Sequence, residues 1–457
     1  MKRHSTISCL IIATLLLAPR TALPAADARP NIVFILADDI GYGDLGCYGA
    51  KQVKTPHCDQ LVREGVRFTD AHAPGAVCTP TRYAFITGQY AWRNPLGAGI
   101  LSGEAPLAID PTKPTTASLL KQAGYTTGLV GKWHIGLGKG DLDFNGEIKP
   151  GPLELGFDDA FFYPATGDRV PCVFIDGHHV VGLEEKDPIR VSYQKKIGDE
   201  PTGKEHPELL TMKPSLGHDS TIINGISRIG FMSGGKAARW KDEEMADTLT
   251  QKAVAFIQRN AGKPFFLYLA THNIHVPRVP HPRWRGTSPH GTRGDFIQEF
   301  DGCVGEVLAT LDKLKLAGNT LVIVTSDNGA VYMRDAVETG HRPNGVLLGQ
   351  KTDAWEGGHR VPLLARWPGR IPAGSVRQAL FTQVDFMATL AEAAGVPVPP
   401  GAAPDGISDL AAFTDPAHAP VKRTETLFLG TGGHALRQGD WVYLPKQGTC
   451  GMTVQVP

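Results

Sequence analysis

Four runs of strand-forming residues, each followed at once by polar side chains, constrain the fold of this chain most strongly. They cover residues 31–37, 125–130, 265–270 and 320–325. Most are continuously apolar, which is typical of strands buried on both faces, as in a parallel sheet. Amphipathic helical patterns lie between them at 242–260 and 296–316. We therefore expect an α/β fold in which helices flank a large, mixed, mostly parallel sheet.

The polar residues after these runs are of the types that bind metals and anions. They are Asp38 with Asp39, Lys132 with His134, His272 with His275, and Asp327 with Asn328. Because parallel strands end at one edge of a sheet, we expect these side chains to meet there. Adjacent carboxylates need a cation, and hard oxygen ligands suit Ca²⁺ or Mg²⁺. Each pair alone is more often a turn, a cap or a surface feature, but four in order indicate a site.

The segment 77–88 places a cysteine at a predicted helix start. Cys78 is followed by Pro80, Arg82 and then Thr87-Gly88. Proline favours the first helical turn, and Arg82 then lies one turn beyond Cys78 on the same face. The N–H groups of a helix N-terminus favour an anion near this sulfur. A cysteine in such a place is usually only a small buried residue, so the segment needs support from the rest of the chain.

Charge and cysteine content exclude several classes of protein. The chain has 46 basic and 46 acidic residues, so no overall field favours nucleic acid or an anionic membrane, and we expect no nucleic-acid partner. Beyond residue 26 the cysteines are Cys47, Cys58, Cys78, Cys172, Cys303 and Cys450. This sparse, irregular set does not predict a disulfide framework.

The order of motifs resembles that of the type I, formylglycine-dependent sulfatases, in the alkaline-phosphatase-like superfamily. The motifs are ADD at 37–39, C-x-P-x-R at 78–82, GKWH at 131–134, H-x-P at 275–277, SDNG at 326–329, Lys351 and WEGG-x-RVP at 355–362. They span roughly residues 29–441. The resemblance implies a sulfuric ester hydrolase that is arylsulfatase-like, with a small antiparallel subdomain at the C-terminal end. Thr81 stands where Ser or Ala is commoner in the family.

The resemblance also implies roles for individual residues. The implied metal ligands, for Ca²⁺ with Mg²⁺ as the alternative, are Asp38, Asp39, Asp327, Asn328 and the modified Cys78. The implied catalytic residues are Cys78, as the formylglycine precursor, with Arg82, Lys132, His134, His275 and Lys351. The implied substrate contacts are Lys132, His272, His275 and Lys351, and the H-x-P spacing favours His275 over His272 beside the leaving oxygen.

A sulfate monoester is an anion with a poor leaving group, so its hydrolysis requires neutralisation of charge, a nucleophile and protonation of the departing oxygen. These residue types supply all three. In the implied mechanism the formylglycine hydrate is the nucleophile, and Asp327 accepts its proton. His275 and Lys351 assist departure of the alcohol. His134 then takes the proton from the second hydroxyl of the hydrate as sulfate is released. The expected partners are a sulfated glycan, or a small sulfate ester, and a maturation enzyme that generates formylglycine.

We predict three parts in the chain. Residues 1–26 have the basic start, short apolar core and small-residue exit of a signal peptide, which implies a secreted or periplasmic protein without a membrane anchor after cleavage. Residues 27–415 form the catalytic α/β domain, with 137–240 as an irregular insertion at the pocket rim. Residues 416–457 form a partial C-terminal subdomain, either abbreviated or cut short.

Two other functions agree with the same residues. One is hydrolysis of phosphate or phosphonate esters by a member of the same superfamily, because metal and cations also serve phosphoryl transfer. The other is glycan binding without catalysis, which would apply if Cys78 stays unmodified. The sequence does not distinguish the sugar, the position of its sulfate, or action at chain ends from action within chains.

Overall fold

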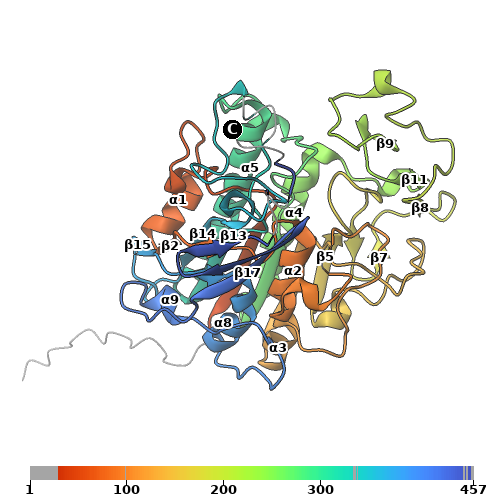
Figure 1. The fold of residues 1–457 in the computed structure, drawn as a ribbon. Coiled ribbons are helices and arrows are strands. Elements are labelled where there is room, and N and C mark those ends of the chain that lie inside the picture. The colour runs from red at the N-terminus through yellow and green to blue at the C-terminus, as the bar shows by residue number, and fades with distance from the viewer. Residues whose placement is uncertain are drawn as a thin grey trace, which may run out of the picture.

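A ten-stranded sheet runs through the middle of the computed structural model, which describes residues 29–97, 99–332, 336, 338–445, 448 and 451–453 (Figure 1). In spatial order its strands are β15 (Ser375–Arg377), β2 (Val66–Phe68), β14 (Leu363–Arg366), β13 (Thr320–Ser326), β1 (Asn31–Ala37), β12 (Phe265–Ala270), β4 (Thr126–Lys132), β5 (Asp159–Tyr163), β6 (Ile175–Asp176) and β7 (His179–Val180). The predicted signal peptide, 1–26, and Cys450 lie outside the described residues.

The five central strands, from β13 to β5, are parallel to one another, and the strands toward both edges include antiparallel pairs. Every residue of β1 is buried, and Ile35 lies between Leu269 of β12 and Val324 of β13. This burial on both faces explains the continuous apolar runs. The predicted sheet class is confirmed, and β1 and β12 have the predicted bounds.

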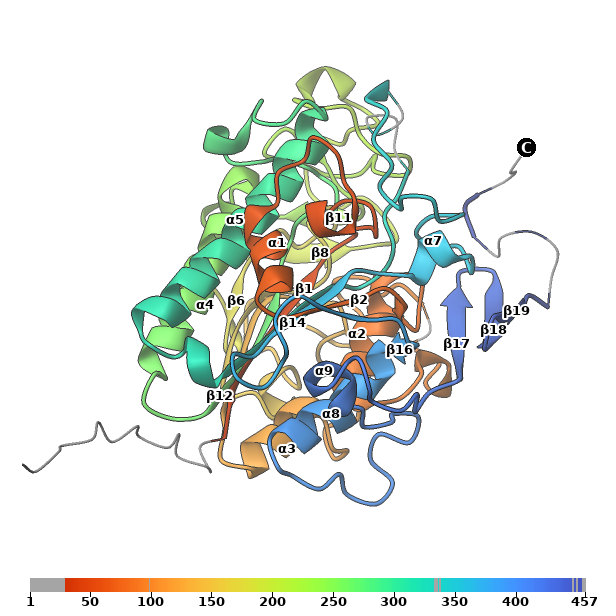
Figure 2. The same ribbon diagram turned by 90° about the vertical axis from the view of Figure 1, so that its left-hand side faces the viewer.

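Helices cover both faces of the sheet (Figure 2). One face carries α1 (Pro56–Arg63), α4 (Met245–Arg259) and α5 (Gly291–Lys313), and the other carries α2 (Cys78–Thr87), α3 (Thr116–Gln122), α8 (Phe386–Ala393) and α9 (Ala411–Thr414). Helix α5 begins five residues before the apolar pattern at 296. Its first turns bury Arg293 and Asp295 through polar contacts, so they carry no apolar periodicity. None of the described helices combines the length and apolar character needed to span a membrane.

Residues 137–240 contain mostly short elements, but the prediction of an irregular insertion missed β5, which pairs with β4 in the central parallel part of the sheet. Besides β5, β6 and β7 they include β8 (Arg190–Ser192), β9 (Ile222–Ile223), β10 (Ile226–Ser227) and β11 (Phe231–Ser233). The hairpin predicted at 170–178 is formed by β6 and β7, at 175–180, and it extends the edge of the large sheet.

A separate antiparallel sheet of β17 (Glu425–Gly430), β18 (Gly433–Gln438) and β19 (Trp441–Tyr443) lies at the C-terminal end. Strand β17 contacts the segment that leads into Cys78, because Ala76 N–H donates to Leu429 O at 2.8 Å and Leu429 N–H donates to Pro74 O at 3.0 Å. The C-terminal sheet therefore supports the start of α2. The domain boundary at 415/416 stays a prediction.

Asp70 joins this sheet to the body of the protein. It lies before the short strand β3 (Ala71–His72), which pairs with β16 (Phe381–Thr382). Arg437 of β18 donates to both Asp70 carboxylate oxygens, at 2.7 and 2.9 Å. Arg360 and His72 contact the same carboxylate. Burial alone would raise the pKa of Asp70, but His72 and the two arginines hold it well below its ordinary value.

Asp70→Asn is expected to lower the free energy of unfolding by about 3 kcal/mol, because Arg437 loses its carboxylate partner and Arg360 keeps only Glu356. Urea denaturation at neutral pH measures the difference. Since the folded pKa of Asp70 is depressed, the difference should be full above about pH 4 and shrink on further acidification. Asp415→Asn, at an exposed carboxylate beside His418, is the control and should change stability by less than about 0.5 kcal/mol. Equal stability of Asp70→Asn and wild type would contradict this role.

Candidate active site

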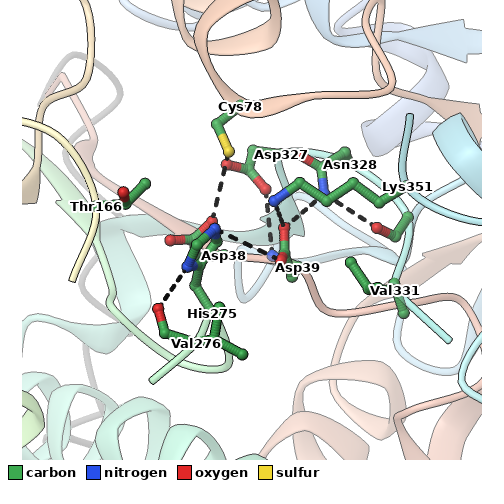
Figure 3. A network of polar contacts seen from close by, with 12 residues as sticks. Asp38, Asp39, Cys78, Thr166, His275, Val276, Asp327, Asn328, Val331 and Lys351 are labelled. Carbon is green, nitrogen blue, oxygen red and sulfur yellow. Dashed lines mark hydrogen bonds and ion pairs between the residues drawn. The ribbon is translucent and has the colours of Figure 1, made fainter. Parts of the chain in front are cut away.

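Four neighbouring parallel strands bring the polar clusters to one edge of the sheet (Figure 3). Asp38 and Asp39 follow β1, Lys132 ends β4, His275 follows β12, and Asp327 with Asn328 follows β13. Cys78 begins α2 and its sulfur faces this group, 3.9 Å from Asp38 Oδ1. One possible ligand atom each from Asp38, Asp39, Cys78 and His275 lies within 4.8 Å of the others.

Each of three buried carboxylates is paired with a buried cation. Lys132 Nζ lies 2.8 and 2.7 Å from the two oxygens of Asp38. Arg82 donates twice to Asp327 Oδ2, from Nε at 3.0 Å and from an Nη at 2.7 Å. Lys351 Nζ lies 2.5 Å from Asp39 Oδ1. The six charges therefore balance within one small region.

The backbone holds the carboxylates in this close arrangement. Asp39 adopts a left-handed conformation with φ of 65°, which costs energy for a non-glycine residue and turns its side chain toward Asn328 and Lys351. Its N–H donates to Asp327 Oδ1 at 3.2 Å, so the ends of β1 and β13 are connected directly.

The three carboxylates differ in proton affinity. Burial, together with the charges of Asp327 and Asp39, raises the pKa of Asp38 to about 7 despite Lys132. For Asp39, burial also opposes ionisation, but Lys351 and His275 outweigh it and hold the pKa below its ordinary value. Arg82 and Lys132 do the same for Asp327. A bound cation would keep Asp38 ionised as well.

The donor set fits a hard divalent cation. Asp38, Asp39 and Asp327 supply carboxylate oxygens, and Asn328 supplies an amide oxygen, the ligand types that Ca²⁺ prefers. Asn328 Nδ2 donates to Asp39 Oδ1 at 2.8 Å, whereas Asn328 Oδ1 is buried without a hydrogen-bond partner among the described residues. A buried amide oxygen without a partner is costly, and a metal ion would satisfy it.

The Cys78 side chain is poorly suited to act as a thiolate. It is 1% exposed, and burial raises its pKa to about 11 even though Lys132 and Lys351 oppose the effect. Cysteine nucleophiles have lowered pKa values instead. Cys78 and the other described cysteines beyond residue 28, namely Cys47, Cys58, Cys172 and Cys303, are free thiols.

Hydrogen bonds define which nitrogen of His134 and His275 is available. His134 Nε2 lies 2.9 Å from Leu101 O, which can only accept, so Nε2 carries the hydrogen and Nδ1 keeps its lone pair. That Nδ1 is buried without a partner among the described residues. His275 Nδ1 likewise donates to Val276 O at 2.7 Å, and its Nε2 lies 3.9 Å from Asp39 Oδ2. Burial and nearby lysines lower the pKa of both rings, that of His275 to about 3.

His272 lies apart from this group. Its ring is buried beneath Gly167, where an added Cβ would lie 2.4 Å from the ring, and packs against Tyr163 and Phe296. Burial lowers its pKa to about 4. The structure thus brings His275 beside Asp39, whereas His272 packs against Tyr163, Phe296 and Gly167.

Three residues that the sequence patterns missed also face the site. Asp168 accepts from Arg169 at 3.2 Å and from His218 Nε2 at 2.7 Å. The charge of Asp168 acts to raise the pKa of His275, against burial and Lys351, and Cys78 is among the groups that raise the pKa of Arg169 after Asp168. Asp168 and Arg169 follow β5, so the rule applied to the other strand ends could have found them. His218 comes from a stretch without periodicity, and no sequence signal marked it.

Comparison with known proteins gives consistent matches. The family model described as sulfatase matches residues 30–396. An N-acetylgalactosamine-6-O-sulfatase of Bacteroides thetaiotaomicron is 53% identical over 384 residues, covering 82% of this chain and 75% of the relative. The steryl-sulfatase of Rattus norvegicus is 36% identical over 407 residues, covering 82% and 69%. A solved Bacteroides thetaiotaomicron protein, studied for its part in the metabolism of multiple glycosaminoglycans, is 48% identical with a TM-score of 0.88 and covers 91% of this chain and 88% of its own.

Glu299 of α5 supports the segment that carries His275. Its carboxylate accepts from Asn273 Nδ2 at 2.8 Å and from His281 N–H at 2.9 Å, on either side of His275. Burial raises the pKa of Glu299 to about 7 despite these hydrogen bonds. The folded protein therefore binds this proton more tightly than the unfolded chain does.

Glu299→Gln is expected to change how stability depends on pH. Because the folded pKa is raised, the wild type should lose up to about 3 kcal/mol through this group as pH rises from about 4.5 to 7, and the variant should not. Urea denaturation of both proteins across this range gives the free energy of unfolding of each as a function of pH. Other titrating groups contribute equally to the two curves and cancel in their difference. Glu306→Gln, at an exposed position of the same helix, is the control. Parallel wild-type and Glu299→Gln curves would contradict the raised pKa.

Proposed function

The chain belongs to the sulfatase family and is a sulfuric ester hydrolase, and we propose that it removes sulfate from a sulfated carbohydrate by formylglycine made from Cys78, with one bound Ca²⁺. The observation that carries this proposal is the position of Cys78. Its buried, protonated sulfur faces three carboxylates and three cations, a setting suited to an anionic ester and unsuited to a thiolate.

Charge balance explains how the site receives sulfate. Arg82, Lys132 and Lys351 offset the three carboxylates. With a divalent ion held by Asp38, Asp39, Asp327 and Asn328, the region has an excess of positive charge that favours binding of a sulfate ester. Lys132 and Lys351 then share their carboxylates with the metal and can donate to sulfate oxygens. Fixed cations in a water-excluded site stabilise the charge that develops during sulfuryl transfer.

The hydrate of formylglycine would supply the hydroxyl that attacks sulfur. The formylglycine side chain would become an aldehyde again when sulfate leaves. His134 is the base suited to the second proton transfer, because its Nδ1 lone pair is free and burial keeps the ring neutral. Its backbone carbonyl accepts from Thr79 Oγ1 at 3.0 Å, which ties it to the residue after Cys78. Asp327, held ionised by Arg82, is the proton acceptor in the first step.

Lys351 and His275 act at the departing alcohol. Asp39 raises the pKa of Lys351 above its ordinary value in spite of burial, so Lys351 keeps its proton and can donate to the leaving oxygen. His275 Nε2 faces the same carboxylate and can relay a proton to that oxygen. A negatively charged substrate would raise the low pKa of His275 and favour this role.

We propose a 6-O-sulfated N-acetylgalactosamine as the substrate unit, on the basis of the 53% identical relative named for that activity. Asp168, which is buried, and the half-buried Arg169 and His218 form a polar group near Cys78 and His275 that suits sugar hydroxyls. His272 would act behind them, by supporting the segment around Gly167. We also propose that residues 1–26 direct export of the protein and that residues 27–415 form the catalytic domain. A maturation enzyme would convert Cys78 to formylglycine.

Sulfate release from matched saccharides tests this function. Wild type should act on 6-O-sulfated N-acetylgalactosamine with kcat/KM at least about tenfold above that for the 4-O-sulfated sugar or 6-O-sulfated N-acetylglucosamine, because hydrogen-bonded hydroxyls discriminate strongly. An aryl sulfate should be cleaved faster than the matching aryl phosphate. Cys78→Ser is the control and should release no sulfate. Preference for the phosphate would support a phosphate or phosphonate ester hydrolase. Binding of the saccharide without turnover, by protein whose Cys78 is converted to formylglycine, would support a non-catalytic role.

Calcium binding can be tested apart from turnover. Titration calorimetry should detect one Ca²⁺ per wild-type molecule, with Mg²⁺ binding more weakly because it demands stricter octahedral geometry. Calcium at 100 times its Kd should stabilise the fold by about 2.7 kcal/mol. Asn328→Ala should weaken binding by about tenfold or more, whereas Asn319→Ala, which removes an amide at the opposite end of β13, should not. Unchanged affinity in Asn328→Ala would argue against Asn328 as a ligand.

A further inference from the structure

A second hollow lies near the strand edge and has no role in the chemistry described above. It has a volume of about 620 Å³, within the range of ligand pockets. Its lining includes Tyr42, Tyr48, Lys51, His290, His341 and Arg342, and we refer to it as the Tyr42 pocket. No aspartate or glutamate is among the described residues that line it.

The basic side chains of this pocket are available for an anion. Lys51 and Arg342 are exposed and form no ion pair with a described carboxylate. His341 Nε2 contacts the buried carboxylate of Asp44 at 2.7 Å, and Arg293 pairs with the same carboxylate at 2.7 Å. The negative charge behind the pocket is therefore already matched, and the pocket itself is positive.

His290 supplies a second, independent indication of a ligand. Its Nε2 lies 3.0 Å from Lys51 O, which can only accept, so Nε2 carries the hydrogen. His290 is 7% exposed, and its Nδ1 is buried without a hydrogen-bond partner among the described residues. Its ring lies against that of His341, with centroids 4.8 Å apart. His290 lines the pocket, and buried polar atoms in proteins normally have a hydrogen-bond partner, so its Nδ1 is suited to accept from a ligand hydroxyl.

Two tyrosines give the pocket a rigid apolar wall. The rings of Tyr42 and Tyr48 meet edge to face, with centroids 4.6 Å apart. Their hydroxyls donate to backbone oxygens, Tyr48 to Phe68 O at 2.6 Å and Tyr42 to Thr69 O at 3.3 Å. Both rings are only half-buried, so part of each is open to a sugar.

Both walls of the Tyr42 pocket are attached to the active site. Tyr42 follows Asp39 by three residues, so their Cα atoms are at most about 11 Å apart. The other wall precedes Lys351, and its Asn344 bonds Ala330 N–H at 2.9 Å and Ala330 O at 3.0 Å, just beyond Asn328. Arg293 also reaches Val331 O at 3.4 Å. In Figure 3, Val331 and Thr166 lie on opposite sides of Asp39.

We propose that the Tyr42 pocket binds an acidic sugar of the same chain, next to the sugar that loses its sulfate. This inference rests on the proposed function. The sulfated sugar contacts the Asp168 side of the site, and the neighbouring unit extends to the Tyr42 pocket. Its carboxylate or sulfate meets Lys51 and Arg342, a hydroxyl reaches His290 Nδ1, and its apolar face packs on Tyr42. The enzyme thereby selects oligosaccharides that carry a second negative charge.

Kinetics on matched substrates test this inference. The substrates are the sulfated monosaccharide, its disaccharide with a uronic acid, the carboxyl-reduced disaccharide, and a disaccharide whose neighbouring sugar carries sulfate instead. Wild type should show a KM about tenfold lower for an acidic disaccharide than for the reduced one. Comparing KM for the disaccharide that contains a uronic acid with KM for the one whose neighbouring sugar is sulfated identifies which anion the pocket prefers. In the double variant Lys51→Ala with Arg342→Ala this advantage should disappear, with KM for the monosaccharide unchanged.

Lys113→Ala, at an exposed lysine outside the pocket, is the matched control, and thermal melting checks that each variant is folded. His290→Ala should raise KM for the acidic disaccharide severalfold with kcat retained. Equal KM values of wild type for the acidic and reduced disaccharides would overturn the inference while sulfate release continued. An equal rise in KM for the monosaccharide and the acidic disaccharide in the double variant would overturn it too. Absence of sulfate release from every substrate would instead contradict the proposed function.

Discussion

Ion pairing between three buried carboxylates and three buried cations is the interaction on which this site depends. Asp38, Asp39 and Asp327 lie at the ends of adjacent strands, where their mutual repulsion would be severe without Lys132, Lys351 and Arg82. Buried charges are costly unless paired, and loss of one partner leaves an uncompensated charge. The parallel sheet supplies the positions, because only adjacent parallel strands end together at such short separations. Charge complementarity thus connects the fold with anion chemistry.

Elements far from the strand ends hold this group in place. The C-terminal sheet bonds to the segment 74–76, immediately before Cys78, and Asp70 joins that sheet to the body. On the other side, Glu299 holds the segment that carries His275. The same arrangement explains why Cys78 is unsuited to thiolate chemistry, since burial beside carboxylates raises its pKa. A modified side chain at this position would avoid that difficulty.

The sequence was sufficient to predict four of the five central strands and the side chains at their ends, because burial on both faces leaves a continuous apolar run. It missed β5, whose apolar run is only four residues long and follows Asp159. It was also sufficient to expect Asp38, Asp39, Asp327 and Asn328 together. The H-x-P spacing favoured His275 over His272 but did not settle the choice, since the irregular backbone after β12 decides which ring turns toward Asp39. The start of α5 was missed because ion pairs rather than apolar contacts bury Arg293. His218 reaches Asp168 across 50 residues of irregular chain, and no periodicity records such a contact.

The fraction of Cys78 converted to formylglycine, measured by peptide mass beside the specific activity, tests the central claim most directly. Preparations made with different amounts of maturation enzyme should contain different fractions of the lighter, aldehyde-containing peptide. Sulfate release per molecule should be proportional to that fraction and extrapolate to zero for unconverted protein. Full activity in a preparation whose Cys78 peptide is entirely unmodified would contradict the account.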